Sequence, residues 1–199
     1  MKDSQLPFDP RQGDALVAVD VQNDFLPGGN LAVPHGDAVV APLNRYIATF
    51  VARGLPVYAT RCWHHPDHCS FTARGGPWPR HCVAGTPGAG FAPGLVLPAS
   101  VVIVSKAKMR DADAYSGFQD TDLAERLRHG GVKRLFVGGL ATDYCVLNTV
   151  QDAVALGFEV VLLEDAIRAV DVTPGDGARA IAKMRALGAR TTALPAAAV

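Results

Sequence analysis

Short apolar runs alternate along the chain with segments of helical periodicity. The runs at 15–19, 55–59, 101–104, 135–137, 158–163 and 190–194 are typical of buried strands. Apolar residues recur at helical spacing over 37–53, 121–128 and 174–187, and again after Thr142 and Asp143, which are good helix N-cap residues. Strands that alternate with helices predict an α/β fold: a central, mostly parallel sheet between two helical layers, a three-layer α/β/α sandwich.

One long segment, 61–100, interrupts this alternation. It is rich in Pro, Gly, His and Cys, and a loop of this length in a compact protein is usually functional or disordered. Its two Trp and four His argue against simple disorder. We expect a single domain over 1–199, with 1–13 as an N-terminal tail and 61–100 as a functional loop.

Composition narrows the class of protein. Hydrophobic residues make up 49% of the 199 residues and the formal net charge is zero, so a globular protein without a basic surface for nucleic acid or membranes is expected. No apolar run approaches the length of a membrane span, and 1–13 does not resemble a secretory signal. Four cysteines are too few for a disulfide framework, which favours a cytoplasmic protein with reduced thiols.

Three reactive side chains follow three different predicted strands. Asp20, Lys106 and Cys145 each lie just past a strand end, and the carboxyl ends of parallel strands meet at one edge of the sheet. A thiol in the first turn of a helix lies near unpaired N–H groups, which favour the thiolate and could hold an oxyanion. Singly, each residue has an ordinary explanation, and Cys145 alone would be a small buried hydrophobe. Together they predict a nucleophile, a base and an electrostatic partner.

The long segment also holds candidate metal ligands. Cys62 and His64 are two positions apart, so in an extended strand both side chains face the same way, and His81 could complete the site. A thiolate and two imidazoles with an open position suit a zinc-like ion. The alternative is a set of surface histidines and buried cysteines. Cys69 and Cys82 could compete as ligands or pair with Cys62 on oxidation.

The motifs of the chain resemble those of the nicotinamidase/pyrazinamidase family of isochorismatase-like cysteine hydrolases. The resemblance covers about 15–192. It rests on these ordered segments: 19–25 and 27–29, 63–64 through 70–71, 75–83, 85–89, 105–107, 114–118 and 141–146.

This resemblance implies a fold and an activity. The fold would be Rossmann-like, and the enzyme would hydrolyse nicotinamide, and pyrazinamide as well, to the acid and ammonia in pyridine nucleotide salvage. Cys145 would be the nucleophile, Asp20 the base, and Lys106, rather than Lys108, their electrostatic partner. A cis peptide bond at Leu140–Ala141 would direct the Ala141 N–H, with that of Cys145, at the oxyanion.

The resemblance further implies a substrate pocket and a metal ion. Its substrate-contacting positions correspond to Phe25, Trp78, Tyr115, Leu140 and Tyr144. Its metal positions correspond to His64 and His81, with His68 as an additional ligand. The family has an aspartate ligand where this chain has Cys62, and a thiolate there would favour zinc over harder ions.

Two other functions stay open at this point. One is an amidohydrolase of the same superfamily that acts on another carboxamide or a carbamoyl substrate; the other is a non-catalytic zinc and thiol protein or redox sensor. An isochorismatase proper is disfavoured, because its ether hydrolysis uses no cysteine nucleophile. The expected partner is a small-molecule amide. A homo-oligomer is common in the family, but the sequence marks no interface.

Overall fold

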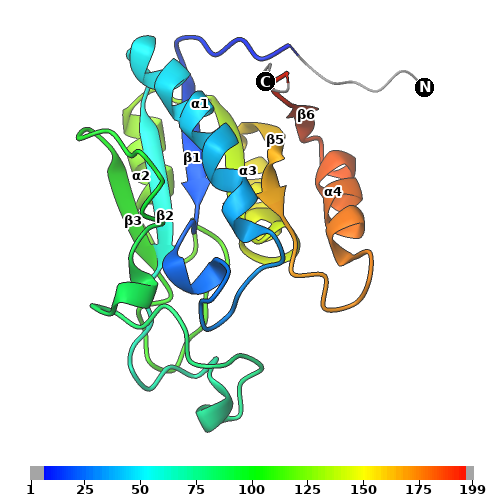
Figure 1. The fold of residues 1–199 in the computed structure, drawn as a ribbon. Helices are drawn as coiled ribbons and strands as arrows, with labels where there is room; N and C mark the ends of the chain where they lie inside the picture. Colours follow the sequence, from blue (N-terminus) through cyan, green and yellow to red (C-terminus); the bar gives the residue numbers. More distant parts are fainter. Residues whose placement is uncertain (1–6, 196–199) are drawn as a thin grey trace.

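The central feature of the computed structural model, which describes residues 7–195, is one six-stranded sheet (Figure 1). Every strand pairs in parallel with its neighbours, and the order is β3-β2-β1-β4-β5-β6. The α/β prediction is thus confirmed, with a fully parallel sheet. The strands are β1 (Asp14–Val19), β2 (Val57–Cys62), β3 (Val102–Lys106), β4 (Arg134–Leu140), β5 (Glu159–Arg168) and β6 (Arg190–Thr192).

The strand order reverses direction at the centre of the sheet. The chain proceeds from β1 outwards to β2 and β3, then returns to pair β4 with the other side of β1. In sheets of this kind ligands bind outside the carboxyl ends of the strands at such a switch point. The loops that follow β1, β2, β3 and β4 gather at that end, at the bottom of Figure 1, together with the long segment between β2 and β3.

Helices cover both faces of the sheet. The α-helices are α1 (Val40–Ala52), α2 (Leu123–His129), α3 (Leu147–Ala155) and α4 (Asp176–Ala186). Figure 1 shows α1 on one face, and α2 and α3 on the other; α4 packs beside α3. This arrangement follows from right-handed crossovers that run in opposite directions from the centre. Short helices are η1 (Asn23–Phe25), η2 (Gly36–Val39), η3 (Thr72–Arg74), η4 (Pro87–Ala89) and η5 (Thr142–Val146).

The core is built from the apolar runs that the sequence identifies. All six residues of β1 are buried because the strand is central and covered on both faces. The predicted strands after β1 begin and end at different residues: β2 and β3 each extend further towards the site, and β5 continues to Arg168. The predicted helix at 37–53 is a short 3₁₀ turn, η2, followed by α1.

Part of the predicted N-terminal tail packs on the core. The ring of Phe8 meets Tyr46 edge-on at 4.8 Å between centroids and Phe136 at 5.7 Å. Residues 1–6, and the alanines at 196–198, lie outside the described part of the chain. Within 7–195, no helix combines the length and the apolar character that crossing a bilayer requires.

Candidate active site

Four functional side chains come from the ends of four adjacent strands. Asp20 follows β1 directly, Cys62 ends β2, Lys106 ends β3, and Cys145 lies five residues beyond β4. All four are buried. The strand-end rule therefore brings together the three residues that the sequence predicts as catalytic, and it adds Cys62 to them.

Lys106 binds the carboxylate of Asp20 in an ion pair away from solvent. The Lys106 Nζ atom lies 2.9 Å from Oδ2 of Asp20, and neither side chain has exposed surface. The other carboxylate oxygen, Oδ1, accepts a hydrogen bond of 2.6 Å from the Thr60 hydroxyl. Asp20 has a positive φ of 48°, a conformation that aspartate tolerates better than most residues. The ion pair and the hydroxyl fix the orientation of the carboxylate.

The two partners of this ion pair have pKa values that both rise, for different reasons. Burial, with the neighbouring charge on Cys62, raises the pKa of Asp20 to about 6, although Lys106 and Thr60 oppose the change. Burial by itself would lower the pKa of Lys106, but the charges of Asp20, Cys145 and Cys62 raise it well above its usual value. The ammonium therefore stays charged, whereas the carboxyl group titrates near neutral pH.

Lys106 also contacts both nearby thiols. Its Nζ lies 3.0 Å from Sγ of Cys62, 3.4 Å from Sγ of Cys145 and 3.2 Å from the carbonyl oxygen of Ala114. Sγ of Cys62 is 3.5 Å from Oδ2 of Asp20. Candidate ligand atoms of Asp20, Cys62 and Cys145 all lie within 4.8 Å of one another. The Lys106 ammonium thus contacts one carboxylate and two sulfur atoms. Lys108, in contrast, is exposed.

The two thiols influence each other strongly. Hydrogen bonding with Cys145, together with the charge of Lys106, lowers the pKa of the Cys62 thiol well below its usual value against the cost of burial. The same contact with Cys62, and burial, raise the pKa of Cys145. The pair therefore loses its first proton readily and its second with difficulty, and the two sulfurs share the remaining proton, so the thiolate can form at either one.

Cys145 lies in an irregular first turn. Residues Thr142–Val146 form a π-helical turn ahead of α3, and the peptide bond between Leu140 and Ala141 is cis, as the family resemblance implied. The carbonyl oxygen of Ala141 accepts hydrogen bonds from the N–H groups of Tyr144 and Val146. The sequence predicts an ordinary α-helical turn here, so the π geometry is a correction.

The predicted N-cap roles of Thr142 and Asp143 are also wrong. Neither side chain caps the turn, and Ala141 occupies the N-cap position. The Asp143 carboxylate instead accepts the backbone N–H groups of Val170 and Asp171, at 3.0 and 2.9 Å. The carboxylate is used in a tertiary contact with the loop after β5, which no local pattern could reveal.

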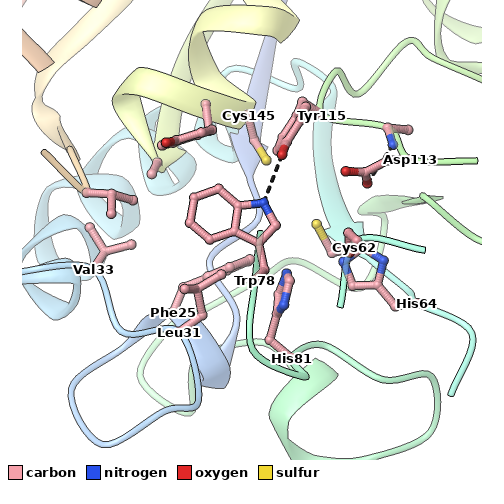
Figure 2. A pocket seen from close by; sticks show the side chains of 15 residues that line it. Phe25, Leu31, Val33, Cys62, His64, Trp78, His81, Asp113, Tyr115 and Cys145 are labelled. Atoms are coloured by element: carbon pink, nitrogen blue, oxygen red, sulfur yellow. Dashed lines mark hydrogen bonds between the residues drawn. The ribbon is translucent and has the colours of Figure 1, made fainter. Parts of the chain in front are cut away.

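A pocket opens onto Cys145 (Figure 2). Four of the five predicted substrate-contacting residues line it: Phe25, Trp78, Tyr115 and Tyr144. The fifth, Leu140, is fully buried in the hydrophobic core and is not part of the lining. Its side chain packs inward because it is the last residue of the central strand β4. Ala141 and Cys145, the predicted oxyanion residues, do line the pocket.

The aromatic side chains hold one another in place around the pocket. Figure 2 shows the Trp78 indole in its centre, with Nε1 donating a 2.8 Å hydrogen bond to the Tyr115 hydroxyl. The Trp78 ring meets Tyr144 edge-on at 5.0 Å between centroids. These flat apolar walls suit a planar aromatic ligand.

Histidines occupy the opposite wall. The ring centroids of His64 and His68 are 4.3 Å apart, and those of His64 and His81 are 4.8 Å apart. Candidate ligand atoms of His64, His68 and Asp113 lie within 4.8 Å of one another.

The structure groups Cys62 differently from the metal set predicted by the sequence. Its sulfur belongs with Asp20 and Cys145, not with His64 and His81. The reason is the sheet register: Cys62 of β2 lies directly beside Lys106 of β3, so the thiol meets the ammonium. A second group of possible ligands, formed by His64, His68 and Asp113, lies apart from this sulfur, and the ligand set Cys62, His64 and His81 stays a prediction.

The histidine wall fits a divalent metal ion. His64 is buried, yet neither of its ring nitrogens has a hydrogen-bond partner of ordinary geometry, which is rare for a native side chain. His81 Nδ1 is 2.8 Å from the carbonyl oxygen of Pro79, so Nδ1 carries the proton and Nε2 has a free lone pair. Burial lowers the pKa of His64 to about 4 and also lowers that of His81, which keeps both imidazoles in the neutral, ligating form.

The ring nitrogens of His68 are less available to bind a metal ion than those of the other two histidines. Its Nδ1 accepts the N–H of Ser70 at 3.2 Å, and its Nε2 lies 3.2 Å from the carbonyl oxygen of Ala112. Both nitrogens thus have protein partners. His64 and His81 are the better candidates, and a carboxylate oxygen of Asp113 lies within 4.8 Å of a ring nitrogen of His64.

Sequence reasoning missed several residues of the pocket. Asp113 lies two residues before Tyr115, and that proximity was the one available signal. Nothing in the sequence distinguished the apolar wall formed by Leu31, Val33 and Val170, because apolar residues usually fill the core.

Comparison with known proteins adds independent information. The isochorismatase domain model matches residues 14–195. The nicotinamidase of Escherichia coli is 40% identical over 196 residues, covering 88% of this chain and 92% of that protein.

Solved structures agree with the sequence comparison. The pyrazinamidase of Pyrococcus horikoshii, in complex with zinc, superposes with a TM-score of 0.88 at 49% identity, over 92% of this chain and 99% of that one. PnC1 from L. infantum, in complex with nicotinate, has a TM-score of 0.82 at 38% identity, over 90% and 92% of the two chains.

Proposed function

The chain belongs to the isochorismatase family, and we propose that it is an amidohydrolase that converts nicotinamide, and also pyrazinamide, to the acid and ammonia. The observation that carries this is the convergence of Asp20 and Lys106 on Cys145, whose residue lines a pocket with aromatic walls. A nucleophile, a base and a fixed cation beside a flat apolar cavity are what hydrolysis of an aromatic amide needs.

Cys145 would act as the nucleophile. Asp20 accepts its proton, directly or through the adjacent Cys62 sulfur, and Lys106 stabilises the negative charge that remains. The sulfur attacks the amide carbon, and the N–H groups of Ala141 and Cys145 would hold the oxyanion. The C–N bond then breaks, ammonia leaves with the proton returned by Asp20, and water hydrolyses the thioester to give the acid.

The aromatic walls would position the substrate ring. Phe25, Trp78, Tyr115 and Tyr144 surround the space in front of the Cys145 sulfur. Stacking and edge contacts to these rings would hold the ring flat and exclude water from the thioester.

His64 and His81 would hold a divalent metal ion, with Asp113 nearby; zinc is supported by the zinc complex of the similar pyrazinamidase. A bound ion of this kind would supply a Lewis-acid partner for the nitrogen of a pyridine ring. His81 would donate its Nδ1–H to the carbonyl oxygen of Pro79, which leaves the lone pair of Nε2 free for the ion. The nicotinate in the L. infantum protein supports a small-molecule ligand of this chemistry.

A direct assay tests the proposal. The purified protein should release ammonia from nicotinamide, and Cys145→Ala should reduce the rate by at least about 10³-fold while the protein stays folded. Cys69→Ala, at a half-buried loop position that is not part of the pocket lining, is the matched control and should retain the parent rate. If the parent releases no ammonia from nicotinamide or pyrazinamide, the proposal fails.

The remaining predictions from the sequence concern the whole chain. We propose one domain over residues 1–199, supported by the single sheet and by the family match over 14–195. Cytoplasmic location and homo-oligomeric assembly stay predictions.

A further inference from the structure

Cys62 places a second thiol inside the catalytic pocket. It ends β2, whereas Cys145 lies in the turn after β4, so the two sulfurs come from elements separated by β1. Both residues line the pocket, and their Sγ atoms lie within 4.8 Å of each other (Figure 2). All four cysteines of the chain are free.

The surroundings of the two sulfurs favour chemistry between them. Lys106 holds both, at 3.0 and 3.4 Å from Nζ, so each sulfur is oriented towards the same cation. Gln22 fixes the backbone of Cys62: its Oε1 accepts the Cys62 N–H at 2.8 Å, and its Nε2 donates to the Cys62 carbonyl oxygen at 2.8 Å. The second thiol is thus held at the nucleophile by contacts on its side chain and on its backbone.

The pocket gives a small oxidant access to this pair. Cys145 is the more exposed of the two, at 6% against 3% for Cys62, and both exposed parts face the cavity. A reactive cysteine next to a second thiol is the arrangement in which a sulfenic acid is resolved as a disulfide. In such an arrangement the second thiol protects the first from irreversible oxidation.

We propose that Cys62 and Cys145 form a peroxide-reactive modification site, in which Cys62 resolves the oxidised nucleophile. Hydrogen peroxide transfers one oxygen to the Cys145 sulfur: the O–O bond breaks, a sulfenic acid forms, and one water leaves. The Cys62 sulfur then attacks the Cys145 sulfur, the S–O bond breaks, and hydroxide leaves as a second water with the Cys62 proton. Two thiols lose two electrons in total, and the peroxide is reduced to two waters.

The disulfide would block catalysis reversibly. Cys145 would no longer carry a free sulfur to attack an amide, and a dithiol reductant would restore it by thiol–disulfide exchange. This loss of activity rests on the proposed function, but the disulfide itself does not. A measurement of the bond therefore separates failure of this proposal from failure of the proposed hydrolase.

The test is peroxide treatment followed by alkylation and peptide mass analysis. The treated protein should lose two of its four free thiols and yield a cross-linked peptide pair that contains Cys62 and Cys145. Dithiothreitol should restore both the thiols and the activity. A bond from Cys62 to Cys82 or Cys69, or retention of all four thiols, would overturn the proposal.

Variants extend the test to the role of Cys62. The activity of each treated sample is compared with that of the same variant before treatment. In Cys62→Ser, peroxide should convert Cys145 to sulfinic acid. Dithiothreitol should then no longer restore the lost activity. Cys69→Ser, whose sulfur lies outside the pair, is the matched control and should recover as the parent does. Equal recovery in Cys62→Ser and the parent would refute a resolving role.

Discussion

The Nζ atom of Lys106 lies 2.9 Å from the Asp20 carboxylate, and neither side chain is exposed. A pair buried this deeply is costly to break, because the remaining partner must either stay charged without water or a counterion or change its protonation state. The same ammonium reaches two thiols, so its position links the stability of the fold to the chemistry of the site.

Removal of the ammonium should therefore affect stability and activity together. Lys106→Met leaves Asp20 buried and unpaired, and we expect the free energy of unfolding to fall by about 3–5 kcal/mol near neutral pH. Denaturant unfolding measures it, and hydrolysis should be lost in the same variant. Lys108→Met, at an exposed position two residues away, should change neither quantity appreciably. Equal stability of the two variants would contradict a structural ion pair.

The fall of kcat/KM at low pH should follow the protonation of Asp20. Its pKa is raised to about 6, mainly by burial, and only the ionised carboxylate can accept a proton. As the pH falls through 6 the ionised fraction falls, so kcat/KM should drop roughly tenfold per pH unit below that point. A midpoint near the ordinary aspartate value of about 4 would count against this assignment.

The hydroxyl of Thr60 should lower the pH at which kcat/KM reaches half its maximum. It donates a 2.6 Å hydrogen bond to Asp20 and stabilises the ionised form, which lowers the pKa. Thr60→Val removes this bond at nearly constant volume, so the acid limb should move to higher pH. Thr60→Ser, which keeps the donor, should leave the limb near its original position. A shift to lower pH in the valine variant would exclude this role.

Metal binding should depend on His64 and not on Cys62. His64→Ala removes the buried imidazole that lacks protein partners, so zinc measured by elemental analysis should fall well below that of the parent. KM for nicotinamide should rise more than kcat falls, because the ion would position the ring. His65→Ala, at the exposed neighbouring position, should retain the metal.

The ligand set itself can be examined with cobalt. Cys62 lies with Asp20 and Lys106, so cobalt-loaded protein should lack the near-ultraviolet charge-transfer absorption of a thiolate ligand. Cys62→Ala should keep its metal content. A thiolate band that disappears in Cys62→Ala would restore the ligand set predicted from the sequence.

Asp143 should control the shape of the pocket without taking part in the chemistry. Its carboxylate accepts two backbone N–H groups of the loop whose Val170 forms part of the pocket wall. Asp143→Ala should cost about 1–3 kcal/mol of stability and raise KM while kcat holds. Asp143→Asn, which keeps one acceptor, should have a smaller effect on KM, as steady-state kinetics can measure. A selective loss of kcat would indicate a direct catalytic role instead.

The apolar pattern of the chain was enough to predict the layers of the fold and the edge of the sheet at which the site lies. The apolar run at 15–19 in β1 had to be buried on both faces, and the alternation with helices required a parallel sheet. Asp20, Lys106 and Cys145 each follow or end a strand, so their meeting at one edge was predictable without any distance.

Tertiary structure alone decided which partner each side chain meets there. Cys62 shares a spacing with His64, but the register of β2 against β3 pairs it with Lys106. Asp143 is a residue type that often caps helices, yet its carboxylate accepts hydrogen bonds from a loop more than 25 residues away in sequence. Local sequence patterns determine whether a segment is a helix or a strand and which of its faces is buried. Strand register and loop packing depend on contacts between segments that are distant in sequence, and a local pattern does not contain those contacts.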